Sequence, residues 1–214
     1  MTRQNRVNPL GELVAQPSRG TLMGNRGCIH DESGRLGRSR WARKLWVFCA
    51  LQFNGRHRQV MAPGQYTELF FLDEATALAA GHRPCATCQR ERYETFLSTW
   101  QRAFGTRPSP SDIDAALHKE RAAVTGADRL PTMPFGRVPI GAFFIQANNA
   151  TPLLRSPTGI LEWSFSGYRR SGQPRLPDAT IVTLVTPVST ARLLASGYAV
   201  RLHASSRDAV PNIK

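Results

Sequence analysis

Two cysteines three positions apart carry the clearest chemistry in this chain. Cys85 and Cys88 stand in the run RPCATC at residues 83–88, which predicts a tight turn that begins with a proline and leads into a helix. Two thiolates at this spacing can face one tetrahedral zinc ion, and the dipole of the following helix favours their deprotonated form. A thioredoxin-like redox pair would need a βαβ context, which the flanking sequence does not offer. The motif therefore predicts a zinc site.

Four further residues are candidates to complete a four-coordinate site. Cys49 lies in the middle of an apolar segment, so it is either a ligand or a small buried side chain. Cys28 and His30 are alternatives for one position, because residues i and i+2 of an extended segment face the same side. Thiolate is the stronger zinc ligand, which favours Cys28, whereas the neighbouring Asp31 could orient the ring of His30. His57 is the remaining candidate.

Residues 70–88 resemble the second half of the metal-binding module of the bacterial Ada DNA-repair proteins. The shared pattern is an aromatic strand, an alanine-rich helix and a turn that carries the second cysteine pair; in this chain these are Phe70-Phe71, Glu74-Ala75, residues 77–81 and Arg83-Pro84-Cys85-x-x-Cys88. The resemblance extends over roughly residues 44–96. The longer stretch Met23–Arg90 also resembles a set of uncharacterised bacterial proteins.

This resemblance implies a small α+β zinc module with four protein ligands, two of which come earlier in the chain. In the Ada proteins, one zinc-bound cysteine accepts methyl groups from DNA phosphotriesters. The present sequence departs from that pattern, because Asn54–Ala62 contains His57 but no cysteine. Methyl transfer is therefore not carried over to this chain.

The charge of the chain points to a polyanionic partner. There are 28 Lys and Arg residues against 15 Asp and Glu residues, which gives a formal net charge of +13. Basic residues are concentrated between Arg19 and Arg58, where the only acids are Asp31 and Glu32. Such a distribution favours nucleic acid, with DNA expected before RNA. The candidate contacts are Arg35, Arg38, Arg40, Arg43, Lys44, Arg83, Arg90 and Arg92.

The cysteine pair must be positioned by the elements on either side of it. The sequence predicts a strand over Leu69–Leu72, a short helix from about Asp73 that ends at Gly81, and a helix from residue 89 to Phe104. Upstream, Leu45–Phe53 is apolar on both faces and predicts a central strand that contains Cys49. The dipeptide Asn54-Gly55 then predicts a hairpin with a return strand over residues 56–61.

The predicted fold class is α+β, with a small zinc-nucleated lobe packed against a β-rich lobe. The expected organisation is a flexible arm (1–20), a zinc-binding lobe (21–105), a helical connector (106–130) and a β-rich lobe (131–214). The connector helix is expected to start at Ser111. In the last lobe, turn residues separate strands expected at 142–146, 151–154, 159–165, 179–186 and 198–203, together with a helix at 189–195.

Three classes of function fit these features. The first is a protein that binds nucleic acid through an arginine-rich surface and is stabilised by structural zinc. The second is an enzyme acting on DNA or RNA, either as a zinc-thiolate alkyl acceptor or as a zinc hydrolase; no catalytic residue is identified. The third is a zinc-stabilised protein-interaction module. Because no signal peptide or membrane-spanning run is present and cysteines are few, a cytoplasmic location and no membrane partner are expected.

Overall fold

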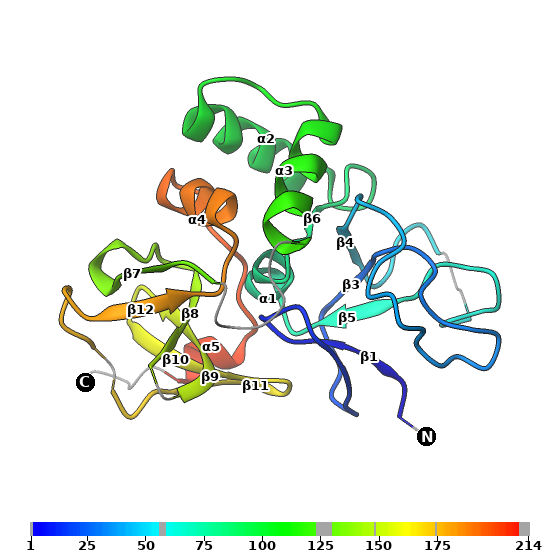
Figure 1. The fold of residues 1–214 in the computed structure, drawn as a ribbon, viewed down its shortest axis with the longest axis horizontal. Coiled ribbons are helices and arrows are strands. Elements are labelled where there is room, and N and C mark those ends of the chain that lie inside the picture. The colour runs from blue at the N-terminus through cyan, green and yellow to red at the C-terminus, as the bar shows by residue number, and fades with distance from the viewer. Residues whose placement is uncertain (1, 56–58, 123–129, 148, 174, 210–214) are drawn as a thin grey trace.

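Two six-stranded sheets and the helices that pack against them make up the protein (Figure 1). The computed structural model describes residues 2–55, 59–122, 130–147, 149–173 and 175–209. Within these ranges the chain forms five α-helices and one short 3-10 helix, so the predicted α+β class is confirmed. No helix in this part of the chain is long and apolar enough to cross a membrane.

The first sheet has the strand order β2-β1-β5-β3-β4-β6. Its strands are β1 (Gln4–Val7), β2 (Leu13–Ala15), β3 (Leu22–Asn25), β4 (Val47–Ala50), β5 (Leu69–Phe71) and β6 (Arg83–Pro84). Most neighbours are antiparallel, but β1 runs parallel to β5 and β4 runs parallel to β6. Since β4 and β6 are parallel neighbours, the segments that follow them leave the sheet at the same end.

The second sheet is antiparallel throughout and has the order β11-β10-β9-β8-β12-β7. Its strands are β7 (Thr132–Pro134), β8 (Phe143–Gln146), β9 (Asn149–Ser156), β10 (Gly159–Ser164), β11 (Gly167–Arg170) and β12 (Ile181–Leu184). The helices are α1 (Glu74–Ala79), α2 (Arg90–Phe104), α3 (Pro110–Ala122), η2 (Phe135–Arg137), α4 (Val188–Ala195) and α5 (Ser205–Asp208).

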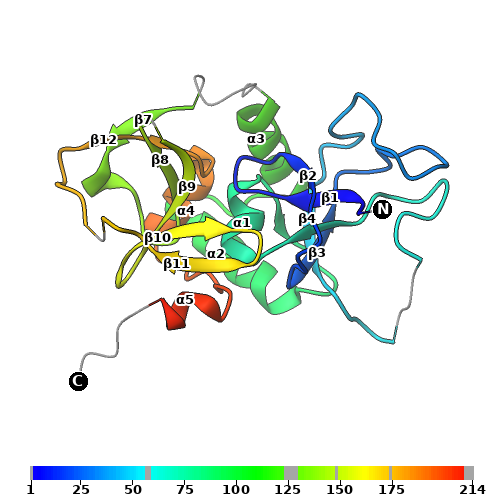
Figure 2. The ribbon, with the colours of Figure 1, turned by 90° about the horizontal axis from the view of Figure 1, so that it is seen from below.

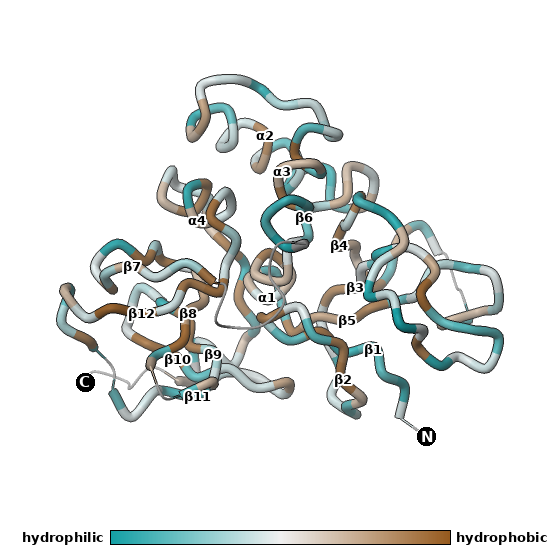
Figure 3. Tube along the Cα trace, viewed as in Figure 1, coloured by the Kyte–Doolittle hydropathy of each residue, from teal (hydrophilic) through white to brown (hydrophobic). Residues whose placement is uncertain are grey.

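Helix α1 lies between the two sheets, and all six of its residues are buried (Figure 1). Ala77 and Leu78 belong to the larger hydrophobic core, which also includes residues of α2, α3, α4 and both sheets. Ala75 and Ala79 pack into a second core formed mainly by the second sheet. Small alanine side chains let the helix backbone approach both layers closely, which explains the alanine-rich sequence. Figure 3 shows hydrophobic residues in α1 and α4 and in strands such as β8 and β12.

Two buried carboxylates at the start of α1 connect the lobes. Asp73 caps the helix by accepting from the backbone N–H of Thr76, and its other oxygen accepts from Tyr168 Oη (2.8 Å) and from the backbone N–H of His203 (3.0 Å). Burial raises the pKa of Asp73, and these donated hydrogen bonds oppose the rise. In the sequence, the only signal that Asp73 and Glu74 join the two lobes is that two consecutive acids stand at the start of an apolar helix.

Glu74 forms the second half of this connection. Its carboxylate pairs with the Arg92 guanidinium of α2 (2.7 Å) and accepts from Tyr198 Oη (2.6 Å) and from the backbone N–H of Arg201 (2.9 Å). The prediction of a strand over residues 198–203 is wrong. In the described structure, backbone N–H groups of that segment bond to the carboxylates of Asp73 and Glu74 instead of to a neighbouring strand.

Several expectations for the N-terminal half are corrected by the structure. Residues 4–7 and 13–15 are sheet strands rather than part of a flexible arm, and Val7 is fully buried. The strand predicted over 45–53 is only Val47–Ala50, because it pairs with β3 and β6 over that length alone. Asn54 and Gly55 adopt the positive φ values of a turn. Residues 59–61 form no strand, and the rest of the predicted return strand lies outside the described residues.

Other boundaries in the C-terminal half differ from the expected ones for local reasons. The sequence does not predict β7 and β11, because both are short and rich in proline, glycine or arginine. Helix α3 begins at Pro110, with Ser109 rather than Ser111 at its start. The Ser109 and Asp112 side chains accept from each other's backbone N–H groups, which is the reciprocal arrangement of a capping box. Strands β8, β10 and β12 and helix α4 lie close to where the sequence predicts them, and β9 extends two residues beyond the expected 151–154 at each end.

The buried ion pair of Glu74 gives a stability prediction. In this pair Glu74 is 2% and Arg92 is 11% exposed. The substitution Glu74→Gln leaves the Arg92 charge without its counter-ion, so we expect the free energy of unfolding to fall by about 3–5 kcal/mol in urea denaturation. Glu162→Gln is the matched control, since Glu162 and Arg169 are 24% and 82% exposed and such pairs contribute about 1 kcal/mol or less. Equal losses in the two variants would contradict this role of Glu74.

Candidate metal centre

Three cysteines from two separate segments meet at one end of the first sheet. Cys49 lies in β4, and Cys85 and Cys88 lie in the turn between β6 and α2. Their sulfur atoms all lie within 4.8 Å of one another, and each residue is half-buried. Thirty-five residues of chain separate Cys49 from Cys85, so only the fold brings them together. This group could hold a metal ion.

The parallel pairing of β4 and β6 positions the cluster. The backbone N–H of Arg83 donates to Trp46 O (3.1 Å), and that of Cys85 donates to Phe48 O (3.0 Å). These bonds place Cys85 beside Cys49. The carbonyl of Cys85 then accepts from the backbone N–H of Gln89 (3.1 Å), which starts the turn into α2. Helix α2 thus follows the cluster directly, as the sequence predicts.

Backbone donors point at two of the sulfur atoms. The backbone N–H groups of Thr87 and Cys88 lower the pKa of the Cys85 thiol, and the N–H of Ala50 lowers that of Cys88. Hydrogen bonds of this kind stabilise the thiolate over the thiol. The turn is therefore shaped to present negatively charged sulfur, which is the form that binds metals.

The pKa of each of the three thiols depends on the other two. A hydrogen bond from Cys49 lowers the pKa of Cys85 to about 4, against the opposite effect of burial. The same hydrogen bond raises the pKa of Cys49, and burial and the charge of Cys85 add to the rise. Burial, together with the charge of Cys85, raises the pKa of Cys88. Near neutral pH and without a metal, these shifts favour the thiolate on Cys85 and the thiol form of Cys49 and Cys88.

The two N-terminal ligand candidates lie away from this cluster. Cys28 is exposed, and its thiol donates to the carbonyl of His30 (3.6 Å). The His30 ring is buried, with Nδ1 bonded to Thr67 Oγ1 (2.6 Å) and Nε2 to Ala62 O (3.3 Å). Both ring nitrogens are thus occupied, so His30 fixes its loop rather than a metal. His57 lies outside the described residues.

The donor set of Cys49, Cys85 and Cys88 fits a metal ion that prefers sulfur. The thiols are converging, half-buried and supported by backbone N–H groups. No fourth His, Cys, Asp or Glu joins them among the residues that the structure describes. A tetrahedral ion held here would therefore have one position left for a water molecule, another ligand or a residue from outside the described ranges.

The arginines predicted to contact nucleic acid fall into two groups. Exposed ones are Arg35, Arg38, Arg40, Arg43, Lys44 and Arg90. Arg83 is only 3% exposed and forms a bidentate pair with Asp114, and Arg92 is bound by Glu74. These two side chains are engaged inside the fold, so their prediction as surface contacts is wrong. The sequence alone cannot distinguish arginines in buried pairs from exposed cations.

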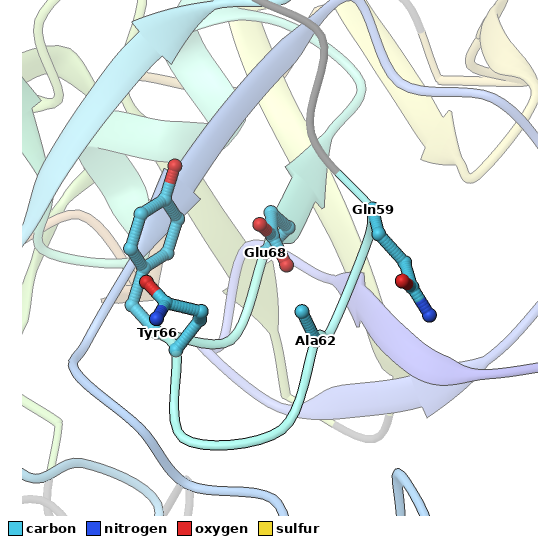
Figure 4. A pocket seen from close by; sticks show the side chains of 5 residues that line it. Gln59, Ala62, Tyr66 and Glu68 are labelled. Carbon is cyan, nitrogen blue, oxygen red and sulfur yellow. The ribbon is translucent and has the colours of Figure 1, made fainter.

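A small pocket lies in the loop between β4 and β5. It has a volume of about 240 Å³ and is lined by Gln59, Ala62, Gln65, Tyr66 and Glu68 (Figure 4). Ligand pockets usually measure about 300–1,000 Å³. The Glu68 carboxylate already accepts from the backbone N–H of Met61 (2.6 Å). The pocket shares no residue with the cysteine cluster, and its lining suggests no reaction.

Comparison of the chain with protein-family models, with curated proteins and with solved structures finds no match. The interpretation of the site therefore rests on its geometry.

The cluster predicts which cysteines retain a metal. We expect Cys88→Ser to lose the bound metal in elemental analysis and to melt at a lower temperature, because metal-binding free energy contributes to folding. Cys28→Ser is the matched control, since Cys28 is exposed and outside the cluster, and it should keep both the metal and the melting temperature.

In the native protein, a thiol reagent should reach Cys28 first and the other three cysteines only after chelation. A metal-free native protein would refute the assignment.

The thiol pKa directions predict how metal affinity depends on pH. Between about pH 6 and 8, Cys85 is a thiolate while Cys49 and Cys88 are protonated, so binding must displace about two protons. The association constant for zinc should therefore rise about 100-fold per pH unit, since each displaced proton contributes a factor of about ten. Titration with a competing chelator at several pH values measures this slope. A slope near zero would mean that all three thiols ionise without metal.

Proposed function

We propose that this protein binds zinc at Cys49, Cys85 and Cys88 and contacts nucleic acid, DNA before RNA, through an arginine-rich surface. The observation that carries the proposal is the convergence of three sulfur atoms within 4.8 Å across two segments of the chain. Thiolate-rich sites select soft or borderline metals, among which zinc is the common structural choice. Elemental analysis would identify the ion; iron or copper in place of zinc would contradict this part.

The zinc would have a structural role. It would hold β4 against the turn that leads into α2. This turn follows β6, the edge strand of the first sheet, which pairs with β4 over only two residues. A pair so short supplies few hydrogen bonds, so metal–thiolate bonds add substantially to its stability. The resemblance to the Ada metal-binding module supports the same interpretation, since a zinc ion holds together a comparable turn and helix there.

The nucleic-acid part of the proposal is supported by the loop between β3 and β4. This loop carries the exposed side chains of Arg35, Arg38, Arg40, Arg43 and Lys44. The sequence contains no acidic residue between Ser33 and Thr67. The loop projects from the end of the molecule that lies away from the second sheet (Figures 1 and 2). The exposed cations outnumber the two acids of this loop, Asp31 and Glu32, and such an excess favours phosphate contact over internal salt bridges.

An enzymatic role is the second candidate, and one observation favours it. The described residues supply three ligands, and three protein ligands with one open position are typical of catalytic zinc. A zinc-bound thiolate could also accept an alkyl group, as the resemblance suggests. A protein-interaction module remains the third alternative, in which the basic charge would have no nucleic-acid partner.

The exposed loop gives a prediction for DNA binding. We expect the dissociation constant for a short duplex to increase steeply with salt, because bound cations are released from the phosphates. The double variant Arg38→Ala/Arg43→Ala should reduce the slope of log K against log salt concentration by about two. Fluorescence anisotropy measures both quantities.

The charge-matched control for this experiment is Arg169→Ala/Arg170→Ala. Both residues are exposed on β11, in the second sheet, and their removal changes the net charge by the same amount. This variant should keep the native slope. If the two double variants behaved alike, binding would depend on net charge alone and the loop would not be the interface.

A further inference from the structure

An arginine-rich cluster without counter-ions surrounds Trp46, which directly precedes β4. The guanidinium of Arg26 lies 4.1 Å and that of Arg121 lies 3.8 Å from the centre of the Trp46 ring. The His82 ring packs against the same indole at 5.1 Å. Arg26 and His82 are 2% and 0% exposed. We call Arg26, His82, Arg121 and Trp46 the Trp46 cluster.

The cluster has more hydrogen-bond donors than acceptors. Four buried side-chain polar atoms have no partner among the described residues, and three of them are nitrogens of this region: Arg26 Nη2, Arg121 Nε and His118 Nδ1. His118 belongs to the same helix as Arg121, and its ring contacts that of Trp41. Unpaired buried donors are rare in folded proteins. A bound anion would supply the acceptors that the two guanidinium nitrogens, Arg26 Nη2 and Arg121 Nε, need.

Neutral acceptors satisfy only part of Arg121. Its two terminal nitrogens donate to the backbone carbonyls of Gly81 and Lys44. These carbonyls carry no charge, so they leave the positive charge of the guanidinium uncompensated. The Nε of Arg121 is buried and has no partner among the described residues, so it can donate to an anion.

The cluster also lacks negative charge. Within the described ranges no ion pair involves Arg26 or Arg121. Burial, followed by the charges of Arg121 and Arg40, lowers the pKa of Arg26 to about 9. Asp114 is the carboxylate whose charge acts on Arg121, but both of its oxygens are bonded to Arg83. Two positive charges thus remain without a counter-ion.

The contacts within the cluster do not replace an anion. The cation–π contacts with Trp46 attract the guanidinium charges but accept no hydrogen bond from their edges. His82 Nδ1 lies 3.1 Å from Ala80 O and donates to it, which leaves Nε2 to accept from Arg26 Nε (3.4 Å). Burial lowers the pKa of His82, as do the charges of Arg26 and Arg121, so the ring is neutral. A neutral imidazole acceptor satisfies one guanidinium nitrogen and no charge.

We propose that the Trp46 cluster binds the terminal phosphate of a nucleic-acid strand. A phosphate monoester is a dianion with several acceptor oxygens, so it offers more negative charge and more acceptors to these guanidiniums than a carboxylate does. A terminal group suits a buried site, because an internal phosphodiester carries chain on both sides. The identity of the strand rests on the proposed function, whereas the anion site itself does not.

The surroundings of the cluster fit a strand that ends there. The backbone N–H groups of Ala42 and Arg43 donate to Arg26 O (2.8 and 3.1 Å), which holds the basic loop directly over the cluster. Trp41, on the same loop, is 40% exposed although it is a large aromatic residue. Exposed tryptophan beside arginine is a platform on which an unpaired base can stack. The terminal phosphate would then lie beneath the first nucleotides.

The test uses the whole zinc-loaded protein in two experiments. In the first, inorganic phosphate should raise the melting temperature in a saturable manner, compared with chloride at equal ionic strength. In the second, anisotropy should show about ten-fold tighter binding, or more, for a single-stranded oligonucleotide with a terminal phosphate than for the same strand with hydroxyl ends. Strands phosphorylated at the 5′ or the 3′ end are measured separately.

Arg26→Met and Arg121→Met should abolish both effects and keep the weaker binding through the exposed loop. These variants are expected to fold, because removal of an uncompensated buried charge in favour of an apolar side chain is tolerated. Arg192→Met is the matched control, since Arg192 lies over the ring of Phe104 at 4.5 Å, outside the cluster. Its phosphate response should equal that of the native protein.

The outcomes separate this inference from the proposed function. Stabilisation by phosphate that survives Arg26→Met would overturn the site. DNA binding without any effect of a terminal or inorganic phosphate would overturn the site and leave the proposed function standing. Stabilisation by phosphate that Arg26→Met abolishes, without any binding of DNA, would support the anion site and overturn the nucleic-acid partner.

Discussion

The arrangement of the whole protein depends on two buried carboxylates, those of Asp73 and Glu74. They stand where β5 passes into α1, and their partners come from β11, α2 and the segment after α4. A buried carboxylate is tolerated only when donors surround it, so the position of each partner is strictly constrained. The two sheets therefore behave as layers of one body around α1, which explains why the larger core contains side chains from both.

The cysteine cluster depends on the same construction. Gly81, at a φ of +77°, ends α1 and turns the chain back toward β4. Position 81 must stay small as well, because a Cβ there would meet the Arg121 side chain at 2.9 Å. The short strand β6 then aligns Cys85 with Cys49 through two backbone hydrogen bonds. The position of the candidate metal site thus depends on the same helix α1 that the two carboxylates hold in place.

The sequence predicts the local part of this architecture well. The strand before α1, the end of that helix at Gly81, the helix after Cys88 and most strands of the second sheet follow from periodicity and turn residues. Cys49 can be suspected but not assigned, because a cysteine in an apolar strand has the same pattern whether it is a ligand or a core residue. Cys28 and His30 satisfy the same local criteria, yet His30 bonds to Thr67 and Ala62 instead. Burial of Arg83 and Arg92 depends on distant partners, Asp114 and Glu74, that no local pattern reveals.

The parallel pair β4–β6 links the metal centre to the Trp46 cluster. Trp46 and His82 lie before these strands, and Cys49 and Cys85 lie at or beyond their other end. The hydrogen bond from the N–H of Arg83 to Trp46 O belongs to the same ladder as the bond from the N–H of Cys85 to Phe48 O. Because β6 contains only two residues, its register has little other support, and a metal bound to Cys49 and Cys85 would fix it. An ion bound there would then also hold Trp46 against His82, although it would not contact the Trp46 cluster itself.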